Sequence, residues 1–132
     1  MINKNTPTQD VVIDNKTIHV EIAKTESDRE KGLGGRAGLA VDGGMLFVFD
    51  SKGVSPTFWM KDMEIPLDII WIKDGKIVKI DKNVAAPPPG TADKALTAYS
   101  PGQPIDYVLE VNGGYADGNG IKVGDSVTLP TL

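Results

Sequence analysis

The sequence predicts a mainly β domain, a compact antiparallel barrel or sandwich of about seven to eight strands with one short helix. Short apolar runs recur along the chain between turn residues, with 15 glycines and 9 prolines among 132 residues. Several of these runs alternate apolar and polar residues, which is the period of a half-buried strand. A barrel or sandwich is expected because closure hides the unpaired edges of the outer strands.

The first elements are a hairpin and the short helix. The segments "VVID" and "TIHVEIA" flank the turn "NK", and Ile18, Val20 and Ile22 lie on one face of the second strand. Thr25, followed three residues later by Asp28, is a helix-capping pattern. The helix is expected over residues 26–31, with a following glycine ending it.

The middle of the chain predicts four further strands. "GGMLFVFD" is a continuous apolar run typical of a buried strand, and "TFWM" is expected to form another. "LDIIWIK" and "KIVKID" are separated by Asp74-Gly75, a pair that favours a type I′ hairpin turn.

The last third begins with a proline-rich loop, "NVAAPPPGTADKA". "IDYVLEVN" then predicts a late strand, "GGYADGNG" a turn around a single helical turn, and "GDSVTL" the last strand. The length corresponds to one domain. We expect a flexible lead over residues 1–9 and a single β-rich domain over residues 10–132.

Composition excludes several classes of function. The net charge of −4 disfavours nucleic acid as a partner, because phosphates require a basic surface. The absence of cysteine excludes thiolate catalysis and cysteine zinc sites. No apolar stretch has the length of a transmembrane helix. We expect the protein to be a monomer.

Several phrases together resemble one protein family. In order, they are "REKGLGGR", "GGMLFVFD", "FWMKDMEIPLDIIWI", "GKIV" and "YVLEVNGGYADGNGIKVGD". They resemble the bacterial and archaeal family catalogued as domain of unknown function 192, over about residues 17–129. The resemblance implies a small β-rich domain without an established activity. It also implies a place outside the cytoplasm, secreted, periplasmic or anchored, because many members follow an N-terminal signal or lipid anchor.

The chain departs from the family pattern at two places. The family often has Gly-Leu-Met before the arginine, where this chain has Gly32-Leu33-Gly34-Gly35-Arg36. Asn-Thr is common after Trp-Met-Lys, where this chain has Asp62-Met63. The second departure puts in doubt any role that needs a neutral amide at that point.

Charged residues lie within apolar phrases, and a buried charge is costly unless it is paired. One interpretation is structural: Arg36 and Lys61 would neutralise Asp68 and Glu110. The other is a pocket for a small polar ligand, a glycan fragment or a partner segment. Phe58 and Trp59 are adjacent, so in a strand one of their rings would point to the pocket mouth. The candidate ligand-binding residues are Arg36, Trp59, Lys61, Asp68 and Glu110.

A metal site and a catalytic pair are the chemical alternatives. The sole histidine, His19, and the thioethers of Met60 and Met63 are ligand types that suit copper, provided that the chain turns after Lys61. Asp68, paired with Asp62 or Glu110, could serve hydrolysis as glycosidase carboxylates do. Because there is one histidine and no nucleophile-elbow phrase, a serine triad is disfavoured.

The leading hypothesis is a soluble binding or accessory domain that works outside the cytoplasm and needs no cofactor. An enzyme, hydrolytic or copper-dependent, is the second hypothesis, and a purely structural module is the third. The third would be favoured if Arg36 and Asp68 were buried and paired with each other.

Overall fold

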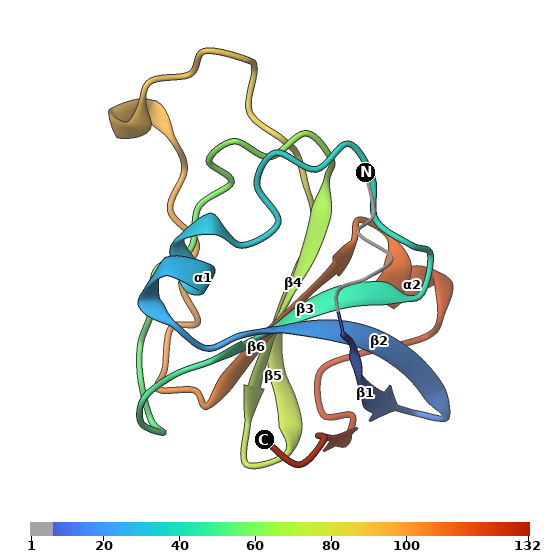
Figure 1. The fold of residues 1–132 in the computed structure, drawn as a ribbon. Coiled ribbons are helices and arrows are strands. Elements are labelled where there is room, and N and C mark those ends of the chain that lie inside the picture. The colour runs from blue at the N-terminus through green and yellow to red at the C-terminus, as the bar shows by residue number, and fades with distance from the viewer. Residues whose placement is uncertain (1–6) are drawn as a thin grey trace.

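The computed structural model describes residues 7–132, which form one seven-stranded sheet in the order β5-β4-β6-β3-β2-β1-β7 (Figure 1). The strands are β1 (Gln9–Ile13), β2 (Lys16–Ala23), β3 (Gly43–Val48), β4 (Leu67–Lys73), β5 (Lys76–Val84), β6 (Tyr107–Asn112) and β7 (Val127–Thr128). The helical segments are α1 (Glu26–Lys31), the 3₁₀ turn η1 (Asp93–Ala95) and α2 (Tyr115–Gly118). The two outer strands meet at the bridge between Lys76 and Ser126, so the sheet is a nearly closed barrel. The predicted fold class is confirmed.

Local signals are followed closely by the structure. The Thr25 hydroxyl accepts a hydrogen bond from the Asp28 amide at 3.0 Å, and α1 ends at Gly32, whose φ is +51°. In the β4–β5 hairpin, Asp74 and Gly75 have φ values of +51° and +72°, as a type I′ turn requires. The expected lead begins with residues 1–6, which lie outside the described residues, and β1 begins at Gln9.

One expectation about the strands was wrong. The segment "TFWM" is not a strand: Phe58 makes a single bridge to Tyr99, and a turn follows at once, in which the Met63 amide donates to the Met60 carbonyl at 3.1 Å. The sheet is mostly antiparallel, as predicted, with one exception: β2 and β3 run parallel from His19 to Ala23. The reason is the connection: α1 and the loop after it carry the chain back before β3 begins.

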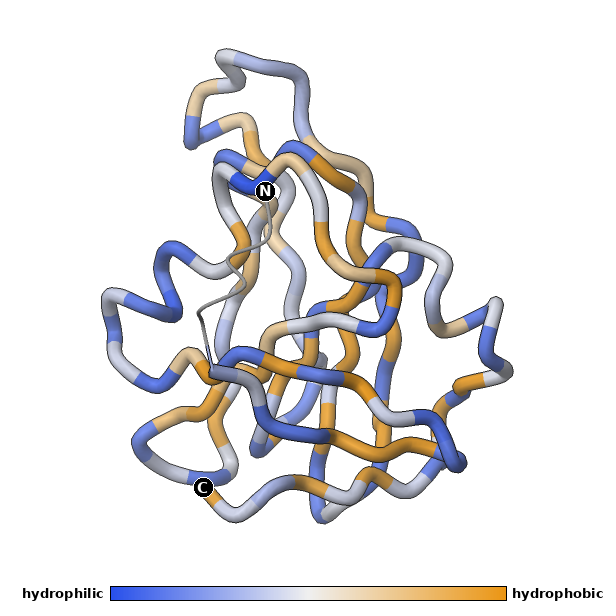
Figure 2. The backbone as a smooth tube through the Cα atoms, turned by 45° about the vertical axis from the view of Figure 1, so that its right-hand side comes forward, coloured by the Kyte–Doolittle hydropathy of each residue, from blue (hydrophilic) through white to orange (hydrophobic). Residues whose placement is uncertain are grey.

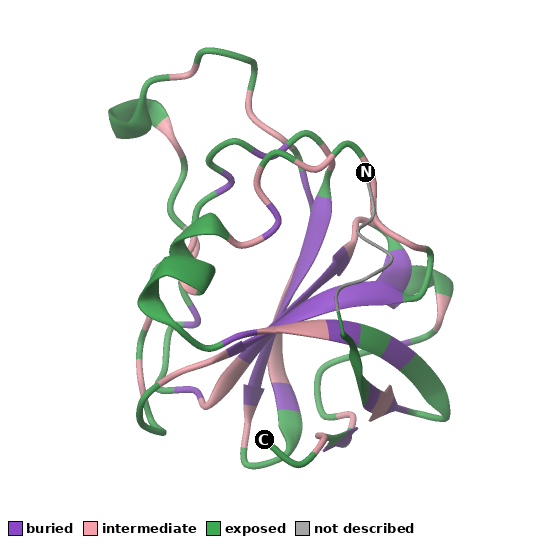
Figure 3. Cartoon of the chain, viewed as in Figure 1, coloured by how far each residue is buried: buried purple, intermediate pink, exposed green. Residues whose placement is uncertain are grey.

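Alternation along the strands creates two hydrophobic clusters, one on each side of the sheet. Figure 2 shows the short apolar and polar stretches that follow one another along the chain. Residues from all seven strands and α2 form the first cluster, which fills the barrel. The second cluster covers the outer face of β3, β6 and β4, beneath α1 and the loops on the same side (Figure 1). Figure 3 shows that β3, β4 and β6 are largely buried and that α1 is largely exposed. We call the second cluster the outer core.

On β4 both faces are buried. Leu67, Ile69 and Trp71 belong to the outer core, whereas Ile70 and Ile72 lie in the barrel. Within residues 7–132, none of the helices has the length and apolar character needed to cross a membrane.

Candidate functional site

Glu110 is a buried acid in the middle of β6. It pairs in register with Met45 on β3 and Ile69 on β4, and its side chain lies on the outer-core face. Only 4% of the residue is exposed, and among residues 7–132 no hydrogen bond or ion pair reaches its carboxyl. Burial therefore raises the pKa of Glu110 from an ordinary 4.5 to about 8. At neutral pH its carboxyl is mainly protonated.

A cavity of about 330 Å³ opens beside Glu110, within the size range of small-molecule sites. Its walls are mainly apolar and aromatic. They include Leu33, Phe47, Phe49, Phe58, Trp59 and Met63. The rings of Phe47 and Phe58 meet edge to face, with centroids 4.8 Å apart. We call this cavity the Glu110 pocket.

Trp59 lies at the mouth of the Glu110 pocket, with 43% of the residue exposed. Phe58 packs onto the outer core instead. The two adjacent rings thus separate, one inward and one toward solvent, although the segment is not a strand.

Two of the three cations that line the pocket, Arg29 and Lys61, are bound to other groups, and the third, Lys31, is exposed. Arg29 donates from Nη1 to the carbonyls of Lys24 at 2.7 Å and Val48 at 2.9 Å, which holds α1 to the end of β3. Lys61 donates to Asp93 at 2.9 Å and lies over the Trp59 ring. The hydrogen bond to Asp93 raises the pKa of Lys61. Neither cation neutralises Glu110.

Gly32 keeps the floor of the pocket open. A Cβ at this position would lie 3.3 Å from Phe47 Cζ and 3.8 Å from Glu110 Oε1. The positive φ of Gly32 also favours glycine. The end of α1 can therefore approach the carboxyl without a side chain in between.

The structure gathers three of the five predicted ligand-binding residues, since Trp59, Lys61 and Glu110 line one cavity. Arg36 is not among them. It binds Glu21 of β2 through both guanidinium nitrogens, with Nη2 2.8 Å from Oε1, and this hydrogen bond raises the pKa of Arg36. The expected pairing of Arg36 and Lys61 with Asp68 and Glu110 was wrong.

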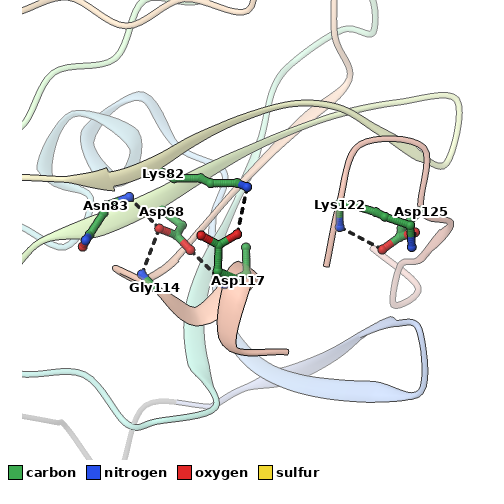
Figure 4. A network of polar contacts seen from close by, with 8 residues as sticks. Asp68, Lys82, Asn83, Gly114, Asp117, Lys122 and Asp125 are labelled. Carbon is green, nitrogen blue, oxygen red and sulfur yellow. Dashed lines mark hydrogen bonds and ion pairs between the residues drawn. The ribbon is translucent and has the colours of Figure 1, made fainter. Parts of the chain in front are cut away.

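Asp68 has a structural position at the end of the barrel that α2 covers (Figure 4). It is fully buried, and its carboxylate accepts three backbone N–H bonds, from Asn83 at 2.7 Å, Gly114 at 3.0 Å and Ala116 at 2.9 Å. Strand alternation explains this, because Asp68 shares the barrel face of β4. With its oxygens occupied by backbone donors, Asp68 has no role in the Glu110 pocket.

The three candidate copper ligands are not brought together. His19 is an exposed residue whose Nδ1 lies 2.8 Å from the Asp10 carboxylate. Met60 and Met63 are joined by the predicted turn, but both are buried in the outer core. Among residues 7–132, no three His, Asp or Glu side chains are grouped to hold a metal ion. Copper binding stays a prediction.

Sequence reasoning missed most of the pocket wall. It did not identify Arg29, Gly32, Leu33, Phe47 or Phe58 as site residues, because each also fits an ordinary helix, turn or core role. One local signal was present: Glu110 interrupts the apolar run "YVLEV" on the same strand face as Val108.

Comparison with known proteins gives a family and two similar folds. The family model DUF192, described as Uncharacterized ACR, matches residues 9–129. A crystal structure of a protein of unknown function from Novosphingobium aromaticivorans is 31% identical, with a TM-score of 0.81 over 92% of this chain and 85% of that chain. A crystal structure described as a putative transcription regulator from Sinorhizobium meliloti is 32% identical, with a TM-score of 0.79 over 96% of this chain and 97% of that chain. No curated protein matches the chain.

Proposed function

This chain belongs to the DUF192 family, and from that premise we propose that it is a binding domain that takes a small molecule into the Glu110 pocket. The buried carboxyl of Glu110 carries the proposal. Buried polar groups normally have hydrogen-bond partners, and a strongly perturbed acid in a cavity is a common mark of a functional site. Among residues 7–132 no fully buried side-chain oxygen lacks a partner, so the Glu110 oxygens keep a small exposed surface beside the cavity, where a ligand group can reach them.

The lining of the pocket supports a ligand with two parts. The aromatic and aliphatic walls suit an apolar or flat body, and Glu110 suits one polar group at its inner end. The size of the cavity favours a small molecule over a long glycan chain or a folded partner segment.

The test is a fragment screen in which ¹H–¹⁵N NMR detects binding. Only two indole N–H signals exist, because the chain has two tryptophans. Trp59 lies at the pocket mouth, whereas Trp71 is buried and donates its indole N–H to Asp81 at 2.8 Å. We expect ligands of the pocket to shift the Trp59 signal more than the Trp71 signal and to lose affinity in Glu110→Leu. Ligands that bind equally well to this variant would contradict the proposal.

Replacing Trp59 by alanine is expected to separate binding from stability. The Trp59 ring is partly exposed, and Lys61 Nζ makes a cation–π contact with it, 5.4 Å from the ring centroid. The free energy of unfolding should therefore fall by less than about 1 kcal/mol. Binding of the same fragments should weaken, since the ring lines the mouth. Urea unfolding and the NMR titration measure the two quantities. A large loss of stability would show that the ring belongs to the core.

A hydrolytic function is the second candidate, and the pKa of Glu110 favours it. A carboxyl that exchanges its proton near pH 8 can act as a general acid or base. Asp68 no longer belongs to this hypothesis, because three backbone amides occupy it. Fragments with ester or amide bonds that disappear over time in the same NMR samples, and persist in Glu110→Gln, would favour an enzyme.

The description of the Sinorhizobium meliloti protein as a transcription regulator does not change this proposal. The net charge of −4 in the present chain disfavours a nucleic-acid surface. The location of the present chain outside the cytoplasm, which the family resemblance implies, stays a prediction.

A further inference from the structure

We infer that the occupant of the Glu110 pocket is a planar molecule that presents an amide-type edge, a hydrogen-bond acceptor beside a donor, to the Glu110 carboxyl. The inference rests on the proposed function and specifies its ligand class. Primary carboxamides and lactams on an aromatic ring carry such an edge.

The protonation of Glu110 determines which edge fits. Its raised pKa means that the carboxyl carries a proton at neutral pH. A neutral carboxyl offers one O–H donor and one carbonyl acceptor next to each other. A ligand that satisfies both at once needs an acceptor and a donor at the same spacing, which an amide provides.

Charged ligands fit this position less well. An ammonium group has no acceptor for the O–H and requires the ionised acid, which burial disfavours. A carboxylate can accept the O–H, but its second oxygen would face the Glu110 carbonyl, acceptor against acceptor. Arg29 and Lys61 are bound to other groups, and Lys31, the third cation of the lining, is an exposed residue of the rim whose charge is screened by solvent.

The surroundings of Glu110 leave it as the pH-sensitive group of the pocket. On the neighbouring strands, its register partners Met45 and Ile69 carry no charge. The ionisable residues that line the cavity come from α1 and the loop above β4. They are Glu26, Arg29, Glu30, Lys31 and Lys61. Both signs are present at this rim, and desolvation is the cause of the Glu110 shift.

The aromatic walls favour a flat molecule. Phe47 of β3 and the adjacent pair Phe58 and Trp59 come from two places in the chain and line the cavity beside the carboxyl. Rings of this kind stack on or meet the edge of another ring within about 4.5–7 Å.

Three matched probes test the inference on the full chain: benzamide, benzoate and benzylammonium. We expect benzamide to bind most tightly of the three probes at about pH 6.5. The shift of the Trp59 indole signal measures the binding of each probe. At about pH 9.5 only about 3% of Glu110 is neutral, so benzamide affinity should fall by up to about 30-fold. Benzylammonium should show the opposite trend, because ionised Glu110 attracts it.

Two variants at Glu110 and one control sharpen the test. Glu110→Gln keeps an acceptor and a donor but cannot ionise, so the pH dependence of benzamide binding should disappear. Glu110→Leu removes both groups and should abolish binding. Glu64→Gln removes an exposed carboxyl outside the pocket lining and should keep the pH dependence.

The outcomes distinguish the inference from the proposed function. If benzoate or benzylammonium binds the pocket more tightly than benzamide at about pH 6.5, the inference is wrong and the pocket remains a ligand site. If none of the three probes shifts the Trp59 signal, the inference is wrong, and the wider fragment screen decides the proposed function. A benzamide affinity that does not change with pH in the wild type would also overturn the inference.

Discussion

Replacing Glu110 by glutamine is expected to stabilise the protein at alkaline pH, by up to about 5 kcal/mol in the free energy of unfolding. Glutamine has nearly the shape of the protonated acid but cannot ionise. The variant therefore avoids the cost that the wild type bears when it must hold a buried carboxyl without a partner. Few single substitutions of a polar residue are expected to stabilise a protein by this much.

The sign and the pH window follow from the pKa of Glu110 in the two states. In the unfolded chain the carboxyl loses its proton near 4.5, whereas in the folded chain it keeps it up to about 8. Between these values the folded state binds more protons, so the stability of the wild type falls as the pH rises. The favourable contribution of protonated Glu110 to the free energy of unfolding is fully present below pH 4.5 and is lost by about pH 8. Each pKa unit corresponds to about 1.4 kcal/mol.

Urea unfolding of both proteins from about pH 4.5 to about pH 9 measures this effect. The difference between variant and wild type should begin near zero and grow with pH. Glu64→Gln is the matched control, because it makes the same substitution at an exposed position. A difference that stays constant with pH would show that Glu110 has a partner in solution.

Stabilisation by this variant would also bear on function. A residue that lowers stability and can be improved by a near-isosteric change is typical of binding and catalytic sites. The combined result of higher stability and altered benzamide binding in Glu110→Gln would connect the stability cost with the pocket.

Replacing Asp68 by alanine is expected to lower the free energy of unfolding by about 3–5 kcal/mol. The change leaves the N–H groups of Asn83, Gly114 and Ala116 without their acceptor at a fully buried position (Figure 4). Each buried donor that loses its partner costs about 1–3 kcal/mol. The damage should concentrate where β5 ends and where α2 begins, because Asp68 connects these two segments.

Asp117→Ala is the matched control for this prediction. Asp117 belongs to α2 and pairs with Lys82 at 2.8 Å, but both side chains are at least half exposed. Removing an exposed pair should cost less than about 1 kcal/mol. Urea unfolding compares the two variants, and hydrogen exchange at Gly114 and Ala116 locates the effect. If Asp68→Ala cost no more than Asp117→Ala, the three amide bonds would not be important for stability.

Local signals in the sequence determined most of the elements. The Thr25 cap and Gly32 fixed the ends of α1, and Asp74-Gly75 fixed the β4–β5 turn, because these structures depend on hydrogen bonds and φ angles within a few residues. The "TFWM" segment failed for the opposite reason. Its apolar residues are buried against the outer core, and burial alone does not require a paired strand.

The sequence by itself determined that this chain forms a small β-rich domain, a barrel or a sandwich, and that charged residues interrupt its apolar strands. The tertiary structure alone decided the partner of each charge. Arg36 binds Glu21, Lys61 binds Asp93 and Asp68 binds backbone amides, whereas the Glu110 carboxyl has no partner among residues 7–132 and lies beside a cavity. The physical reason is range: strand and turn preferences act over a few residues, whereas pairing and desolvation depend on which distant segments the closed sheet brings together.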